Sequence, residues 1–177
     1  MKELLDKLSS YHLFNYLVPG VVFSLVAQRV TQHSFSHSNL VISFFLYYFI
    51  GLVLSRIGSL MIEPFLRLIH FIRLGSYADF VRASMKDEKL ELISEVNNMY
   101  RTLSAAFVLL LCLRGYDHVQ SSHPAVAKYS PLVGIGLLAL LFAFAYRKQT
   151  KYIVDRVRHV VEEHDPNLGG KDETHRS

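Results

Sequence analysis

The sequence predicts an all-α membrane protein, a polytopic helical bundle with about four transmembrane helices and helical extensions on the cytoplasmic side. Of its 177 residues, 51% are hydrophobic and only 19% are charged. The apolar residues are gathered in blocks, whereas a soluble domain of this length spreads them as stripes over its helices and strands. Because lipid offers no partner to backbone N–H and C=O groups, a block of about 20 apolar residues crosses a bilayer as a helix.

The first predicted span runs from Leu13 to Val30. The segment before it, Lys2 to Leu8, has leucines on one side and charges on the other, which predicts an interfacial helix ahead of the crossing. A cleaved signal peptide is the competing interpretation. Cleavage needs small residues near the end of the apolar run, where Leu25, Gln28 and Arg29 stand, so we expect the span to remain in the protein.

The second predicted span begins near Leu40, after a short polar hairpin, and is uninterrupted through Leu54. A helix-compatible pattern continues to Pro64, and apolar residues continue through Ile72. A helix over residues 40–72 would be roughly 50 Å long at about 1.5 Å per residue, which is well beyond the thickness of a bilayer core. This helix is therefore expected to project into the cytoplasm.

The third span is the shortest, Thr102 to Leu113, and forms part of a long returning helix predicted over residues 86–114. A short helix over residues 76–84 is expected to close the hairpin before it. The fourth span runs from Pro131, in a favourable first-turn position, to Tyr146. The two outer connections would then be residues 31–39 and residues 115–130.

Lys and Arg are concentrated on one side of these spans. They gather before the first span, between the second and third, and after the fourth, whereas the two outer connections hold almost none. The positive-inside rule therefore places both chain ends and the central segment in the cytoplasm. The predicted divisions are residues 1–72 with the interfacial helix and first two spans, 73–98 as a cytoplasmic helical hairpin, 99–146 with the last two spans, and 147–177 as an amphipathic helix and mobile tail.

Arg56 and Glu63 are the leading functional candidates at the membrane. A charge at membrane depth costs roughly 3 kcal/mol or more unless it faces protein or water, so charged residues there often mark a function. The two residues lie seven positions apart on nearly the same helix face, and Arg67 follows Glu63 at ion-pair spacing. They could line a water-filled path. Alternatively they form a juxtamembrane ion pair in which Arg56 extends to the lipid headgroups.

A second polar stripe follows the returning helix at steps of three and four residues: Glu91, Glu95, Asn98 and Arg101 or Thr102. In a symmetric oligomer such a stripe could ring a cytoplasmic vestibule, and a solvated helix face is the alternative. Asn97 and Asn98 are poor helix formers, which suggests that their amides bond to neighbouring helices. The candidate pore or gating residues are therefore Arg56, Glu63, Asn97, Asn98 and Arg101.

Asn15, Pro19 and Gly20 interrupt the first apolar span. Such residues can mark a kink or a close contact between helices. Packing is the favoured interpretation, because small and polar residues commonly join membrane helices.

Five basic residues follow the fourth span and are candidates for binding anionic lipid or a nucleotide: Arg147, Lys148, Lys151, Arg156 and Arg158. A lipid contact is the expected role immediately inside a span.

The outer connections carry imidazoles and a carboxylate that could meet around a divalent metal: His33, His37, Asp117, His118 and His123. Their spacing is loose, so a metal-dependent membrane enzyme or transporter is only a third hypothesis, and we expect no metal or other cofactor. The sequence holds no nucleophile elbow, Walker loop, HExxH or paired-carboxylate motif, so we expect no enzymatic activity.

Three stretches resemble a group of small bacterial membrane proteins from phage-defence operons: NYLVPGVVF from Asn15 to Phe23, GLVLSRIGSLMIEP from Gly51 to Pro64, and SEVNNMYRT from Ser94 to Thr102. The nearest comparison is with the membrane effector of the Hailong system, and the stretches cover about a fifth of the chain. The resemblance implies an oligomeric, channel-like effector in the inner (plasma) membrane of a bacterium. Such an effector is held closed by, or responds to, a nucleotide signal and depolarises the membrane of infected cells.

The leading hypothesis is a homo-oligomeric pore opened by its cytoplasmic helices, because four spans enclose little by themselves whereas a cyclic ring can surround a central path. The alternative is a non-conducting membrane anchor or scaffold whose cytoplasmic hairpin recruits a soluble partner. The expected partners are the lipid bilayer, further copies of the chain, a nucleotide or oligonucleotide, and a soluble protein encoded in the same operon.

Overall fold

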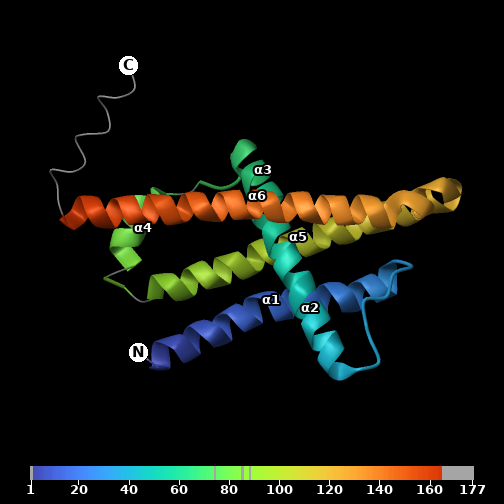
Figure 1. The fold of residues 1–177 in the computed structure, drawn as a ribbon, viewed down its shortest axis with the longest axis horizontal. Coiled ribbons are helices and arrows are strands. Elements are labelled where there is room, and N and C mark those ends of the chain that lie inside the picture. The colour runs from blue at the N-terminus through green and yellow to red at the C-terminus, as the bar shows by residue number, and fades with distance from the viewer. Residues whose placement is uncertain (1, 74, 85, 88, 165–177) are drawn as a thin grey trace, which may run out of the picture.

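The computed structural model describes residues 2–73, 75–84, 86–87 and 89–164, and the fold in this part of the chain is all-α, as predicted. The helices are α1 (Lys2–Val30), α2 (Leu40–Ile57), the π-helix η1 (Gly58–Ile62), α3 (Glu63–Leu68), α4 (Tyr77–Ser84), α5 (Lys89–Ser122) and α6 (Pro124–His164). Helices α1, α5 and α6 run along the long axis of the molecule, and α2 crosses them steeply (Figure 1). The predicted mobile tail, residues 165–177, lies outside the described residues.

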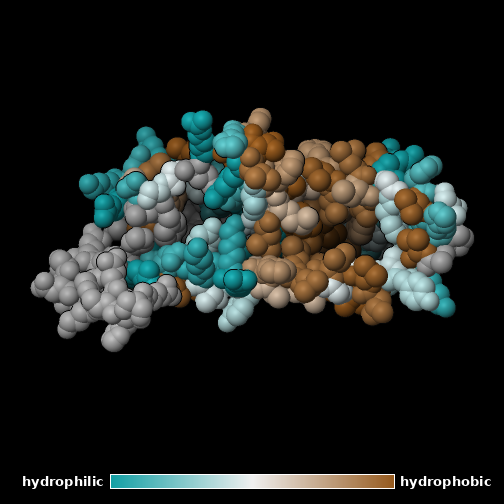
Figure 2. Space-filling model, turned by 90° about the horizontal axis from the view of Figure 1, so that it is seen from above, coloured by the Kyte–Doolittle hydropathy of each residue, from teal (hydrophilic) through white to brown (hydrophobic). Residues whose placement is uncertain are grey.

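In the described part of the chain four helices are long and apolar enough to cross a membrane, in agreement with the four predicted spans. The candidate spans are residues 13–30, 40–68, 92–122 and 126–158. Hydrophobic side chains form a band across the molecule, with hydrophilic side chains on both sides of it (Figure 2). Helix α1 begins and α6 ends at the same end of the molecule, where α4 also lies (Figure 1). We call this the α4 end and the opposite one the hairpin end.

The N-terminal segment is not a separate interfacial helix. Helix α1 runs without a break from Lys2 to Val30, and its apolar part is the candidate span at residues 13–30 that the sequence predicts. Pro19 lies inside the helix and is fully buried. A continuous helix keeps the backbone groups of Lys2 to Leu8 in the same hydrogen-bond ladder as those of the span.

The helix that starts at Leu40 continues past the second span, as predicted, but through a π-helical turn. Pro64 has no N–H to donate to the carbonyl four residues earlier, and its ring would clash with that carbonyl in a regular α-helix. The Glu63 N–H instead bonds to the Gly58 carbonyl, five residues back, and the chain continues into α3. Such single π-helical turns are frequent at functional sites.

This helix ends at Leu68, four residues before the predicted end at Ile72. His70 has a left-handed backbone conformation with a φ of 59°. Its N–H bonds to the Arg67 carbonyl at 3.0 Å, and the Phe71 N–H bonds to the Leu66 carbonyl at 2.9 Å. These two bonds form a Schellman motif, which ends a helix and usually has glycine in the left-handed position. The apolar pattern therefore continues beyond the end of the helix. The sequence signals this end only weakly, because histidine takes the position at which glycine is usual.

The predicted outer connection at residues 115–130 is wrong. Helix α5 continues to Ser122, and α6 begins at Pro124, so that only His123 separates them. Pro124 takes the first-turn position that the sequence analysis assigned to Pro131. Pro131 instead lies inside α6, where the Ser130 hydroxyl donates to the Ala127 carbonyl that the proline nitrogen cannot serve.

Helices α1 and α2 cross in backbone contact through Gly20 and Gly51. A Cβ added to Gly51 would overlap the carbonyl oxygen of Tyr16, and one added to Gly20 would overlap that of Tyr47. The predicted close helix contact around Gly20 is thus present, and it brings α1 against α2 near the centre of both spans. The buried core lies beside this crossing and consists of Phe23, Ala27, Leu54, Ala106 and Leu110.

At the hairpin end, Asp117 joins α5 to the connection between α1 and α2. Its carboxylate accepts a hydrogen bond from the Gln32 N–H at 3.0 Å and lies 3.1 Å from the His33 Nε2, while its side chain is 4% exposed. We expect Asp117→Ala to lower the free energy of unfolding by about 1–3 kcal/mol, because the Gln32 N–H loses its acceptor. Thermal unfolding in detergent measures this effect. The exposed neighbour His118 provides the control, since His118→Ala should change stability by less than about 0.5 kcal/mol. Equal effects of the two substitutions would contradict the role of Asp117.

Candidate functional site

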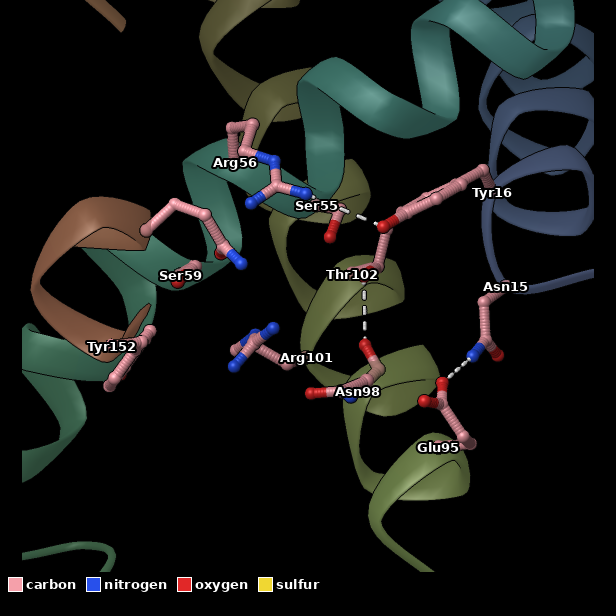
Figure 3. Close-up of a pocket in the computed structure, with 11 residues that line it drawn as sticks. Asn15, Tyr16, Ser55, Arg56, Ser59, Glu95, Asn98, Arg101, Thr102 and Tyr152 are labelled. Carbon is pink, nitrogen blue, oxygen red and sulfur yellow. Dashed lines mark hydrogen bonds between the residues drawn. The ribbon is translucent and has the colours of Figure 1, made fainter. Parts of the chain in front are cut away.

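A polar cavity of about 280 Å³ lies between the four spans. Its α1 residues, Asn15 and Tyr16, precede Gly20 and so lie between the α1–α2 crossing and the start of α1 at the α4 end (Figure 1). Its lining comes from α1, α2, η1, α5 and α6, so that every span contributes to it (Figure 3). The lining residues are Asn15, Tyr16, Ser55, Arg56, Ser59, Glu95, Asn98, Arg101, Thr102, Gln149 and Tyr152. The cavity therefore brings Arg56 of α2 together with the polar stripe of α5, two groups that lie far apart in the sequence.

Glu63 joins these two groups through a pair of ion pairs. One carboxylate oxygen accepts from Arg67 of the same helical segment at 2.6 Å, and the other accepts from Arg101 of α5, also at 2.6 Å. The glutamate is 8% exposed, and the Arg101 side chain is 22% exposed against 49% for Arg67. The sequence predicts the Arg67 pair, whereas only the tertiary structure brings Arg101 to the same carboxylate.

Gly58 allows α5 to come this close to η1. A Cβ at position 58 would lie 3.2 Å from the Arg101 Cγ and 3.2 Å from the Arg101 carbonyl oxygen, tighter than an ordinary van der Waals contact. The π-helical turn that begins at Gly58 also places Glu63 and Ser59 on the side of the chain that faces α5 and α6. Local backbone geometry at Gly58 and Pro64 therefore positions the charged groups.

Arg56 extends into the cavity from α2, where the Arg101 side chain also lies (Figure 3). Its guanidinium lies 3.4 Å from the Tyr16 hydroxyl, a long hydrogen bond. No carboxylate among the described residues forms an ion pair with it. The alternative interpretation, an ion pair between Arg56 and Glu63, is therefore not found in this part of the chain, where Arg101 pairs with Glu63 instead.

The polar stripe of α5 divides between the cavity and the surface. Glu95 accepts a hydrogen bond from the Asn15 amide of α1, and Asn98 lies beside it on the cavity wall (Figure 3). The Thr102 hydroxyl donates to the Asn98 carbonyl at 2.8 Å. Asn97 is exposed on another face of the helix and does not line the cavity. The side chain of Glu91 lies outside the described residues.

Lys148 differs from the other basic residues after the fourth span. Its ammonium group donates to the Ser59 carbonyl at 2.8 Å and to the Ser59 hydroxyl at 2.7 Å, which connects α6 to η1. A smaller hollow of about 20 Å³ beside Lys148 shares Arg56 and Ser59 with the main cavity. The remaining four predicted lipid contacts are exposed on α6: Arg147, Lys151, Arg156 and Arg158.

Sequence reasoning missed Tyr16, Ser55, Gln149 and Tyr152 as cavity residues. Each is polar and stands near the end of an apolar block, which was the available signal. Such residues are common at membrane boundaries without any shared site, and tyrosine is enriched there. Only the packing of the four spans shows that these residues face one another.

The outer histidines do not gather around a common centre in the described part of the chain. No group of three or more His, Cys, Asp or Glu side chains suited to a metal ion occurs among the described residues. His33 lies against Asp117, while the His37 Nδ1 accepts from the Asn39 N–H at 3.1 Å. His118 and His123 are exposed.

The cavity therefore combines fixed positive charge with many hydrogen-bond donors in a partly dry setting. Electrostatic interactions are stronger there than in water, so the site can bind an anion or change conformation when a charge is added or removed. Comparison of the chain with protein-family models, with curated proteins and with solved structures found no match.

Proposed function

We propose that the protein is a homo-oligomeric membrane channel whose opening depends on the charged groups around the polar cavity. The observation that carries this proposal is the set of charged residues within the candidate spans: Arg56 and Arg101 line the cavity, and Glu63 is paired with Arg101. Charges at this depth are expensive, and in membrane proteins they commonly mark ion pathways or the groups that control them. A role without enzymatic chemistry fits this arrangement.

The sparse packing of α6 supports the oligomeric part of the proposal. Only 6% of its span is buried, against 22–28% for the other three spans. Gly136, Ala139 and Ala143 are exposed at spacings that place them on one face of the helix. Small residues let membrane helices approach closely, so this face suits a neighbouring copy of the chain. A ring of such copies would surround a central path.

The biological setting of the proposal comes from the sequence. The resemblance of three stretches to Hailong-type effectors supports a role in antiviral defence, with a nucleotide or oligonucleotide as the signal and a soluble operon partner. The positive-inside pattern supports a bacterial inner membrane with the α4 end in the cytoplasm. The charged cavity would then lie on the side from which a cytoplasmic signal arrives.

Ion flux from liposomes tests the channel. We expect purified protein to release a trapped ion, and Arg56→Gln to change the rate of release by at least about fivefold, the range of a coupling free energy between two sites. The control is Arg147→Gln, which removes an equal charge from the exposed surface of α6. Vesicles that stay tight under all conditions, with and without added oligonucleotides, would contradict conduction.

Exposed apolar residues after α3 favour a second function, a non-conducting anchor or scaffold. Leu68 and Phe71 are each 75% exposed, and Ile69 is 52% exposed. Contiguous exposed apolar residues can bind a partner protein. A scaffold should retain a soluble operon partner when the full-length protein is purified, and Phe71→Ser should abolish that retention. Together with an absence of ion flux, these results would support the scaffold function in place of the channel function.

A further inference from the structure

The cavity between the four spans has the size and shape of a small ligand site. Its volume of about 280 Å³ is close to the lower end of the range for small-molecule sites, about 300–1,000 Å³. Its walls come from rigid helices rather than loops, and the Glu63–Arg101 pair and the Asn15–Glu95 bond join those helices beside it. The walls are therefore held in place before any ligand arrives.

The charges around the cavity favour an anion. Among the described residues two carboxylates lie close to the cavity: Glu63 is paired with Arg67 and Arg101, and Glu95 lines the cavity with its oxygen bonded to the neutral Asn15 amide. Arg56 has the Tyr16 hydroxyl at 3.4 Å as its hydrogen-bond partner in the described structure. Lys148 adds a further positive charge at the adjoining hollow. Positive charge thus exceeds negative charge among the described residues at this site.

An unused hydrogen-bond donor also favours an anion in the cavity. The Nε of Arg101 is buried and has no hydrogen-bond partner among the described residues. A buried donor without an acceptor costs about 1–3 kcal/mol, so an acceptor placed there would be stabilised. Arg56 and Arg101 both extend into the same space (Figure 3), and paired guanidinium groups recognise the tetrahedral oxygens of phosphate through several parallel bonds.

The cavity lies toward the α4 end of the four candidate spans. Its lining includes Asn15, two residues into the first candidate span (residues 13–30), and Gln149, in the last third of the fourth (residues 126–158). Basic pockets between transmembrane helices on the cytoplasmic side bind phosphate-bearing lipid headgroups. We propose that the cavity binds a phosphate group, carried by an anionic lipid headgroup or by a free anion. This binding does not depend on ion conduction.

Ligand-induced stabilisation of the full-length protein in a neutral detergent tests the proposal. In one arm, inorganic phosphate replaces chloride at constant ionic strength. In the other, mixed micelles contain phosphatidylglycerol or, as the control, diacylglycerol, which lacks the phosphate headgroup. A ligand that binds the folded state raises the midpoint of thermal unfolding in a concentration-dependent way. Retention of phosphatidylglycerol in native mass spectrometry gives a second readout.

Arg56 is the residue to vary, because no described carboxylate depends on it. We expect Arg56→Gln to weaken phosphate or phosphatidylglycerol binding by about tenfold or more, as the loss of charged hydrogen bonds requires. Arg56→Lys should lie between Arg56→Gln and the unchanged protein, since it keeps the charge and loses the planar fork. Arg114→Gln removes an exposed charge of α5 that does not line the cavity and should leave binding unchanged.

The two arms identify the source of the phosphate. Stabilisation by inorganic phosphate alone supports a free anion, stabilisation by phosphatidylglycerol alone supports a lipid headgroup, and stabilisation by both supports the shared chemistry. The proposal is overturned if neither ligand stabilises the protein, or if Arg56→Gln and Arg114→Gln bind equally well. No ion gradient is used, so the outcome is independent of the flux measurement.

Discussion

Replacing Glu63 by glutamine is expected to lower the free energy of unfolding by about 3 kcal/mol or more, as removal of one member of a buried ion pair does. The carboxylate is the acceptor for both Arg67 and Arg101, at 2.6 Å each. Arg67 is half-exposed and can turn toward water, whereas Arg101 is mostly buried. The loss should therefore arise chiefly from the Arg101 guanidinium, which is left without its acceptor.

Two further variants separate this explanation from a general effect of the substitution. Arg67→Gln should cost less than about 1 kcal/mol, because an exposed ion pair contributes little. The double variant Glu63→Leu/Arg101→Met should recover most of the stability, because it removes both buried charges together. Thermal unfolding of the three proteins in one detergent provides the comparison. Equal losses of stability for Glu63→Gln and Arg67→Gln would show that the unpaired Arg101 guanidinium is not the main cause of the loss.

Replacing Gly51 by alanine should lower the free energy of unfolding about as much as replacing Glu63 by glutamine. The new Cβ would overlap the Tyr16 carbonyl oxygen, and backbone of a neighbouring helix cannot move aside as the end of a side chain can. Membrane helices associate through close packing rather than through the hydrophobic effect, so forcing α1 and α2 apart removes much of what holds them together. We expect Gly51→Ala to lower the free energy of unfolding by about 3 kcal/mol, the upper end for an overpacked core.

The matched control for this substitution is Gly115→Ala. Gly115 is also helical, and a Cβ added to it meets no atom within 4 Å. Alanine is the better helix former, so this variant should be unchanged or more stable by up to about 1 kcal/mol. The double variant Gly20→Ala/Gly51→Ala should lose less than the sum of the two single losses, because one separation of α1 from α2 relieves both clashes. A mild Gly51→Ala, or strictly additive losses, would mean that the crossing is looser than described.

The contacts around the polar cavity show which partners can be predicted from the spacing of residues in the sequence. Arg67 lies four residues from Glu63 on one helix, and this short-range geometry was enough to predict their ion pair. Arg101 lies 38 residues from Glu63, and no spacing rule connects the two. For the same reason Lys148 was predicted to contact lipid, although it bonds to Ser59 across 89 residues. Long-range partners depend on which faces of the helices pack together.

Hydrophobicity along the chain was by itself sufficient to determine the all-α class and the four candidate spans, because a block of apolar residues must satisfy its backbone groups within a single helix in lipid. It did not determine where the helices end. The Schellman motif at His70 and the continuation of α5 through Gly115 rest on local backbone geometry that residue type encodes weakly. The cavity itself was decided by tertiary structure, since the contact of Gly20 with α2 and the approach of α5 to Gly58 set which polar side chains face one another.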